Sequence, residues 1–340
     1  MDSLGDVESV AALPTGIDIA YDTFGSQDAE PLLLVMGLGG PMTWWNPDLC
    51  RMLADRGFLV IRYDNRDVGR STRVPGRTRL RKRTIVRAFL GDRRHAPYTL
   101  DDMAADGFGL LDHLGIERAH VTGVSMGGMI AQTMAITHPD RVRSLVSMSS
   151  TTGSRRVGWQ DPRLLPLLLS PVARTREDYV ERAVHSWRQI GSQVYPTPDD
   201  QVALRAAETW DRGYDPAGGA RQTLALLAQP DRAARLGELT MPVCVVHGLD
   251  DRLIHPSGGR ATARAIRAAE LVLVPGMGHD IPRPLYGLVA DAIWRTAART
   301  GQSDASATSV SSSSRRNPAI RHTSGTISRQ ATKPTSSEPL

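Results

Sequence analysis

Short, unbroken apolar runs alternate with segments of helical periodicity through most of this chain, and this alternation limits the fold more than any other feature. Such runs, bounded by turn residues, are typical of strands buried on both faces. The segments that we interpret as strands are 17–24, which alternates between apolar and polar residues, and 31–36, 58–63, 119–124, 142–148, 242–247 and 270–274. The segments that we interpret as helices are 43–56, 100–114, 126–137, 259–269 and 284–300. This order predicts an α/β fold with a mostly parallel, doubly wound sheet.

The alternation stops in the middle of the chain. Residues 152–236 offer only helix-like segments and proline-rich breaks, so we interpret them as a helical cap. The α/β core then consists of residues 15–151 and 237–300, and the cap is expected over the carboxyl edge of the sheet, where ligands bind in such folds. We expect residues 1–14 to be a flexible N-terminus. Residues 301–340 are rich in Ser and Thr and poor in large apolar side chains, which predicts a disordered tail.

Composition and charge exclude several classes of protein. The apolar content of 41% and charged content of 23% are ordinary for a globular protein. No apolar run approaches the ~20 residues that span a bilayer, and the N-terminus has no secretory pattern, so we expect a soluble, cytoplasmic protein. The net charge of +5 is carried by arginine, with Lys82 and Lys333 as the only lysines. No nucleic-acid-binding motif accompanies it, so we expect no nucleic-acid partner. The sequence indicates no oligomeric state.

A Gly-x-Ser-x-Gly pentapeptide, Gly123-Val-Ser-Met-Gly127, directly follows one expected strand and opens an expected helix. In this context the motif is a nucleophile elbow, a sharp turn that exposes the serine hydroxyl at the edge of the sheet. Glycines at both ends let neighbouring backbone pass closely. A phosphate-binding loop is excluded because the Lys-Ser/Thr pair of that motif is missing. We therefore predict that Ser125 is a catalytic nucleophile.

A base and an acid follow Ser125 in the order acid, then histidine. His279 lies directly after the last expected strand, in Pro275-Gly-Met-Gly-His-Asp280, where the glycines permit a loop that presents the imidazole. Asp250 and Asp251 follow the preceding strand, and adjacent residues of an extended loop point to opposite sides. We favour Asp251 as the carboxylate that orients His279, with Asp250 as the alternative.

The glycine-rich segment Met36-Gly-Leu-Gly-Gly40 follows the first buried strand. A tetrahedral intermediate of acyl transfer needs two hydrogen-bond donors aimed at its oxyanion. We predict that these donors are the backbone N–H groups of Met126, the residue after the nucleophile, and of Leu38 in this loop.

Together these segments resemble the α/β-hydrolase superfamily from about Thr15 to Thr300, and within it a bacterial esterase branch. That branch includes polyketide methylesterases of the aclacinomycin methylesterase kind and proteins known as carboxylesterases or lipases. The segments that carry the resemblance are Arg62-Tyr-Asp-Asn-Arg-Asp-Val-Gly-Arg-Ser71, Gly123–Gly128, His138-Pro-Asp-Arg141 and Pro275–His279. The chain differs at Met36-Gly37, where many members have His-Gly, but a backbone donor is unaffected by that change.

The resemblance implies hydrolysis of a carboxylic ester with a sizeable apolar portion through an acyl-enzyme on Ser125. It implies no cofactor and no metal ion. Three alternatives stay open: thioester or lactone hydrolysis on the same triad, perhydrolase chemistry of the cofactor-free haloperoxidase type, and a non-catalytic binding protein of the fold. A binding protein is expected to lack a triad residue, and none is missing here.

Two further features carry predictions about binding. Residues Arg73–Arg94 hold nine basic residues against one acid, which indicates either contact with anionic lipid or a solvated basic loop. Of Trp44 and Trp45, we expect one to line the substrate pocket and the other to pack in the core. In the cap, we expect Trp187 and Trp210 to line the same pocket.

Overall fold

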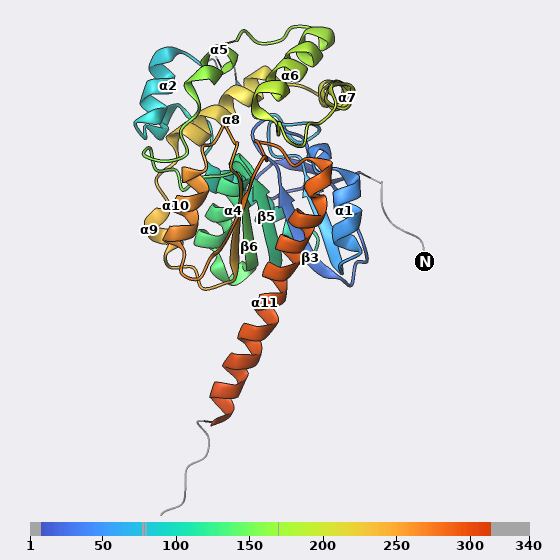
Figure 1. Ribbon diagram of the computed structural model, residues 1–340, viewed down its shortest axis with the longest axis vertical. Helices are drawn as coiled ribbons and strands as arrows, with labels where there is room; N and C mark the ends of the chain where they lie inside the picture. The colour runs from blue at the N-terminus through green and yellow to red at the C-terminus, as the bar shows by residue number, and fades with distance from the viewer. Residues whose placement is uncertain (1–7, 77, 79, 169, 314–340) are drawn as a thin grey trace, which may run out of the picture. The chain divides into compact units, whose positions relative to one another are not determined.

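The predicted α/β fold is confirmed by the computed structural model, which describes residues 8–76, 78, 80–168 and 170–313 (Figure 1). Among these residues, eight strands form one sheet in the order β1-β2-β4-β3-β5-β6-β7-β8. Strands β3 to β8 pair in parallel, whereas β1 and β2 are antiparallel to their neighbours. The bounds of the strands are β1 Ser9–Ala12, β2 Asp18–Phe24, β3 Glu30–Val35, β4 Phe58–Tyr63, β5 Ala119–Val124, β6 Val142–Met148, β7 Val243–Gly248 and β8 Glu270–Val274.

Helices cover both faces of this sheet. Helices α3 and α4 share one hydrophobic cluster with the sheet, and α1 and the first turns of α11 share another. In the central strand β4, Leu59 and Ile61 belong to the first cluster, whereas Phe58 and Val60 belong to the second. Because side chains alternate along a strand, a sheet covered on both faces is apolar throughout, which explains the unbroken apolar runs. The core helices are α1 Pro47–Ala54, α3 Leu100–His113, α4 Met126–Thr137, α10 Ser257–Ala265 and α11 Tyr286–Ser313.

Between β6 and β7, the described residues form helices joined by turns. These helices are α5 Leu165–Leu168, α6 Arg176–Ile190, α7 Asp199–Asp211, α8 Pro216–Ala228 and α9 Ala233–Leu236. Figure 1 shows α5 to α8 gathered beyond one edge of the sheet, whereas α9 lies beside α10 of the core. We use the name cap for α5 to α8 and their connecting turns. Local sequence starts these helices: the side chains of Thr175 and Asp215 accept hydrogen bonds from the first turns of α6 and α8.

The Arg-rich stretch forms the short helix α2 (Lys82–Phe89), which packs against α8 of the cap. Val86, Phe89 and Leu90 are exposed by 56%, 48% and 77%, so the helix presents apolar as well as basic groups at the surface. The ring of Phe89 lies 4.6 Å from the guanidinium carbon of Arg155. Contact of Arg73–Arg94 with anionic lipid stays a prediction.

Part of the N-terminus, which we expected to be flexible over residues 1–14, forms a strand; residues 1–7 lie outside the described residues. Ser9–Ala12 form β1, which pairs with β2 and buries Ala11 completely. A strand of four residues gives a weak sequence pattern because its hydrogen bonds come from the neighbouring strand and only one of its side chains is buried.

The C-terminal helix also differs from expectation, because α11 continues to Ser313 rather than ending near residue 300. Extending an existing helix needs no new nucleus, so polar residues can follow the apolar turns that pack on the core. The rest of the predicted tail, residues 314–340, lies outside the described residues. None of the described helices is both long and apolar enough to cross a membrane.

A buried ion pair joins the cap to the core. Arg221 of α8 binds Asp67 through two hydrogen bonds of 2.8 and 2.7 Å, and the two side chains are 2% and 0% exposed. Asp67 also accepts hydrogen bonds from the hydroxyl of Tyr98 at 2.6 Å and the N–H of Val74 at 2.8 Å. The carboxylate is therefore held from both sides of the boundary between cap and core.

Removing the cation of this pair is expected to destabilise the protein strongly. Arg221→Met leaves the carboxylate of Asp67 buried without its counter-ion, which costs about 3–5 kcal/mol of unfolding free energy. The matched control is Arg176→Met, because Arg176 pairs with Asp211 at 2.8 Å where the two side chains are 44% and 57% exposed. An exposed pair of this kind contributes little to stability because solvent screens it, so the control is expected to unfold at nearly the same urea concentration as the wild type. Urea unfolding of both variants measures the difference, and equal losses would contradict the prediction.

Candidate active site

Ser125 lies at a strained turn between β5 and α4. Its backbone has φ 58° and ψ −122°, a positive φ that residues with side chains rarely adopt. A Cβ on Gly123 would lie 2.1 Å from the carbonyl oxygen of Gly127, and a Cβ on Gly127 would lie 2.1 Å from that of Val35. Both glycines of the pentapeptide are therefore needed for the close approach of backbone that lets the turn present Ser125.

Three side chains from three loops form one hydrogen-bonded chain. The Nε2 atom of His279 lies 3.0 Å from the Oγ of Ser125, and its Nδ1 lies 2.7 Å from the Oδ2 of Asp251. These residues follow β5, β8 and β7, strands whose carboxyl ends lie at the same edge of the sheet. The structure thus brings the three predicted triad residues into contact.

Asp251 is oriented by several donors at once. Its Oδ1 accepts the backbone N–H groups of Leu253 at 2.9 Å and Ile254 at 2.8 Å, while Oδ2 faces His279. Burial by itself raises the pKa of this carboxyl, but the neighbouring imidazoles of His279 and His247 outweigh burial and hold its pKa well below the usual range. Asp251 is therefore an anion fixed against His279.

The neighbouring aspartate lies in a different environment. Asp250 is exposed, and its backbone N–H donates to the carbonyl of Met277 at 3.0 Å. Of the two candidates, only Asp251 is buried against His279.

The two predicted oxyanion donors belong to segments that lie beside Ser125. Met126 is the first residue of α4, so its N–H has no acceptor within the helix. The loop that holds Leu38 runs against the nucleophile, because a Cβ on Gly37 would lie 3.2 Å from the Cβ of Ser125. Leu38 itself lines the cavity described below. This placement is compatible with both donors, whose role stays a prediction.

The loop of Leu38 is held by side chains that the sequence analysis did not single out. Gln222 of α8 is completely buried, and its Oε1 accepts the N–H of Gly39 at 2.8 Å while its Nε2 donates to the carbonyl of Arg66 at 2.9 Å. Asn65 donates to the carbonyl of Met36 at 2.9 Å. A glutamine of an amphipathic helix gives no sequence signal for such a role, because its partner Gly39 lies 183 residues away.

The loop of His279 is also held by the cap. The backbone N–H of His279 donates to the carbonyl of Ile190, at the end of α6, at 2.7 Å. Ser192 accepts the N–H of Gly278 at 2.9 Å, and its own N–H donates to Asp280 at 2.9 Å. The cap thus contacts both the histidine loop and the loop of Leu38.

A cavity of about 260 Å³ opens at Ser125 and His279. Its wall combines the Leu38 loop and α1 region of the core with residues of the cap helices α6 and α7. Apolar side chains, among them Val124, Ile190 and Ile281, line much of it. The position of the cap over Ser125 makes this cavity the candidate substrate pocket.

Two of the four candidate tryptophans line this cavity. Trp44 and Trp187 belong to the cavity wall, with their rings in edge-to-face contact at 5.6 Å. Trp45 instead is 0% exposed in the core, so of the adjacent pair it is the packing residue. Trp210 does not line this cavity; its ring stacks on that of Tyr214, with the ring centres 5.2 Å apart, a contact that helical periodicity alone does not reveal.

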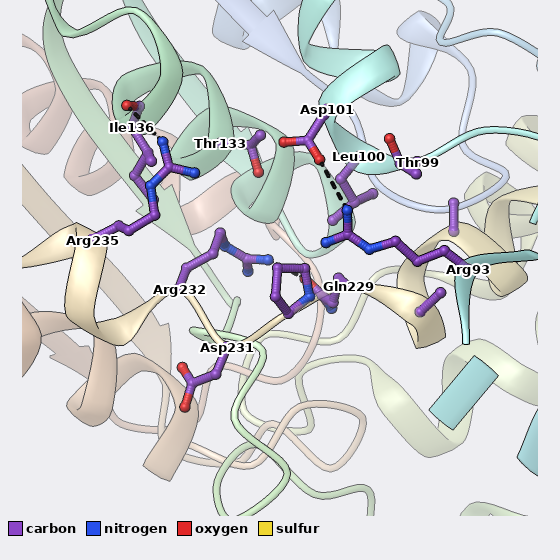
Figure 2. A pocket seen from close by; sticks show the side chains of 13 residues that line it. Arg93, Thr99, Leu100, Asp101, Thr133, Ile136, Gln229, Asp231, Arg232 and Arg235 are labelled. Carbon is purple, nitrogen blue, oxygen red and sulfur yellow. Dashed lines mark hydrogen bonds and ion pairs between the residues drawn. The ribbon is translucent and has the colours of Figure 1, made fainter. Parts of the chain in front are cut away.

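A second cavity, of about 110 Å³, lies between α3, α4 and the segment that leads into α9. Figure 2 shows Arg93, Arg232 and Arg235 around it, with Arg93 directed to Asp101. The guanidinium of Arg232 already donates to the carbonyl of Thr151 at 2.9 Å and to Gln132 at 3.2 Å. This cavity is small and its charged groups have partners, so we place the candidate active site at Ser125.

Comparison with known proteins finds a matching family and related enzymes. The family described as alpha/beta hydrolase fold matches residues 30–282. Rhodomycin D methylesterase DauP of Streptomyces sp. (strain C5) is 30% identical over 292 residues, which are 79% of this chain and 91% of that protein. 3-Oxoadipate enol-lactonase 2 of Acinetobacter baylyi is 27% identical over 251 residues, which are 72% of this chain and 81% of that protein.

Solved structures agree on the fold. The crystal structure of a hydrolase from Pseudomonas aeruginosa PA01 superposes with a TM-score of 0.65 at 24% identity, covering 86% of this chain and 98% of that one. The enol-lactonase from Burkholderia xenovorans LB400 superposes with a TM-score of 0.63 at 24% identity, covering 86% and 100%.

Proposed function

We propose that this chain, which belongs to the alpha/beta hydrolase fold family, cleaves carboxylic esters through an acyl-enzyme on Ser125. The observation that carries the proposal is the continuous chain of hydrogen bonds from Ser125 through His279 to Asp251 at the floor of a cavity. A serine hydroxyl in hydrogen-bond contact with an oriented imidazole is the arrangement that activates a nucleophile for acyl transfer.

In this mechanism the hydroxyl of Ser125 attacks the ester carbonyl while Nε2 of His279 takes its proton. Asp251 holds the other ring nitrogen and stabilises the imidazolium that forms. The N–H groups of Leu38 and Met126 donate to the oxyanion of the tetrahedral intermediate. His279 then protonates the departing alcohol, and a water molecule activated by the same imidazole releases the acid.

The relatives support an ester as the substrate. The name of one relative, rhodomycin D methylesterase, supports a methyl ester in particular. The lactonase among the relatives keeps lactones as a second substrate class, since ring opening of a lactone is the same acyl transfer to serine. The apolar lining of the cavity supports an acid portion with a sizeable apolar surface.

A substrate panel tests the proposed function. Methyl and nitrophenyl esters of increasing acyl length are compared with matched thioesters and lactones, using purified wild type and Ser125→Ala. We expect saturable hydrolysis of oxygen esters by the wild type only. Preferential cleavage of thioesters or lactones would reassign the substrate class. Peroxide-dependent halogenation without ester turnover would replace the proposal with perhydrolase chemistry.

The pH dependence of hydrolysis follows from the environment of His279. Burial lowers the pKa of this imidazole, but the adjacent Asp251 carboxylate outweighs burial, and the pKa lies above the ordinary value of 6.5. His279 must be neutral to accept a proton, so kcat/KM is expected to rise with pH through an inflection above 6.5. A profile across roughly pH 5 to 9 measures this. An inflection well below the ordinary value would contradict the geometry.

A further inference from the structure

Arg205 of α7 is a cation built into the wall of the candidate pocket. Its guanidinium carbon lies 4.0 Å from the centre of the Trp187 ring and 5.1 Å from that of Trp44. These two aromatic faces hold the guanidinium, yet its Nη2 atom is buried and has no hydrogen-bond partner among the described residues. Burial accordingly lowers the pKa of Arg205.

Asp280 lies in the same pocket wall as Arg205 and also has a buried polar atom without a hydrogen-bond partner among the described residues. Its Oδ1 accepts both the N–H and the hydroxyl of Ser192, whereas its Oδ2 is buried and has no partner in the described part of the chain. Burial raises the pKa of this carboxyl, while the charge of Arg205 lowers it. The charges of the two side chains therefore interact, although no hydrogen bond or ion pair among the described residues joins them.

A buried polar atom without a hydrogen bond lowers the stability of the folded protein. Two such atoms in one substrate pocket therefore indicate that the substrate supplies their missing hydrogen bonds. Arg205 offers a donor and Asp280 an acceptor. A hydroxyl group both accepts and donates, so it satisfies the two together. A carboxylate would satisfy Arg205 but would meet the charge of Asp280, and an alkyl chain would satisfy neither. The hydroxyl of Thr43, buried in the same wall without a partner, adds to the polarity of this region.

We propose that Arg205 and Asp280 form a subsite for a neutral hydroxyl group on the acid portion of the substrate, so that hydroxylated esters are preferred over their unsubstituted counterparts. The inference rests on the proposed ester hydrolysis at Ser125. It narrows the substrate class from apolar esters to apolar esters that carry a hydroxyl group within reach of Arg205 and Asp280.

The test is a ratio of kcat/KM values. Methyl naphthoate is compared with its ring-hydroxylated isomers, one position at a time, and with the corresponding carboxylated compounds. We expect the wild type to prefer one hydroxylated isomer by on the order of a hundredfold, the upper range for a hydrogen bond to a charged group. Arg205→Met, which keeps an unbranched apolar side chain but has no hydrogen-bond donor, is expected to bring this ratio close to one. Arg205→Lys retains a donor and is expected to keep part of the preference.

Arg188→Met is the matched control, because Arg188 is an exposed arginine of α6 that pairs with Asp199 at the surface. It is expected to keep the ratio of the wild type. The thermal unfolding midpoints of all variants show whether each is folded. A wild type with no preference for any hydroxylated isomer, as expected if water alone bridges the two groups, would overturn the proposal. A preference for the carboxylated compounds would overturn it in favour of an anion site.

A second measurement separates the subsite from the proposed function. Free hydroxynaphthoic acid and naphthoic acid are compared as protectants of Ser125 against a fluorophosphonate probe, which requires no ester turnover. Stronger protection by the hydroxylated acid, lost in Arg205→Met, supports the subsite even if no ester in the panel is cleaved. Equal protection by the two acids counts against the subsite even if esters are cleaved rapidly.

Discussion

Ser125→Ala is expected to lower kcat for ester hydrolysis by about 10⁶-fold, because the variant has no hydroxyl to form the acyl-enzyme. The fold is expected to survive. The side chain of Ser125 makes its hydrogen bond with His279, whereas the strained turn is held by backbone contacts and by the two flanking glycines. Residual activity then reflects only the oxyanion donors and substrate binding. Steady-state kinetics together with thermal unfolding measures both expectations.

Covalent labelling provides the control for this variant. A fluorophosphonate probe should modify the wild type at Ser125, as mass spectrometry of the digested protein can locate, and should leave Ser125→Ala unmodified. An adduct on any other serine, or substantial turnover by the variant, would refute the assignment of the nucleophile.

Asp251→Asn is expected to lower kcat by about 10⁴-fold, the loss seen when the orienting acid of such a triad becomes an amide. An asparagine can still accept the N–H groups of Leu253 and Ile254 through its carbonyl oxygen, so the loop keeps its shape. It then presents an NH₂ group to Nδ1 of His279, which favours the tautomer with its proton on Nε2. That tautomer cannot accept the proton of Ser125.

Asp250→Asn is the matched control because it makes the same chemical change one residue away on an exposed side chain. Its kcat is expected to stay close to that of the wild type, because Asp251 rather than Asp250 is paired with His279. Measuring kcat of both variants under the same conditions tests which aspartate orients His279. Equal losses, or a larger loss in Asp250→Asn, would mean that the loop turns the other carboxylate toward His279 during catalysis.

Local pattern was sufficient to predict the sheet and the residues now found in contact at its edge. The strands β3 to β7 are largely buried because both faces of the sheet are covered. A loop residue directly after a parallel strand must lie at the carboxyl edge of the sheet. Ser125, Asp251 and His279 all occupy such positions. Their convergence follows from strand order, which places β5, β6, β7 and β8 side by side.

The roles that sequence reasoning left open or missed depend on tertiary contacts. Nothing local distinguishes Trp44 in the pocket from Trp45 in the core, since the choice depends on how one turn of backbone enters α1. Arg205 resembles any solvated arginine of an amphipathic helix until Trp44 and Trp187 are placed beside it. Gln222 likewise acquires its role only when α8 packs on the core.

The contacts of Gln222, Ile190 and Ser192 have a consequence for engineering the cap. A chimaera that receives the cap of a relative would gain that relative's pocket wall, but it would also exchange the groups that hold the loops of Leu38 and His279. Recombination at the boundaries of the cap therefore transplants part of the catalytic scaffold along with the specificity. A graft that keeps Gln222 and the segment from Ile190 to Ser192 from this chain, and takes only the pocket-facing positions from the donor, would preserve the alignment of the triad while changing what the pocket admits.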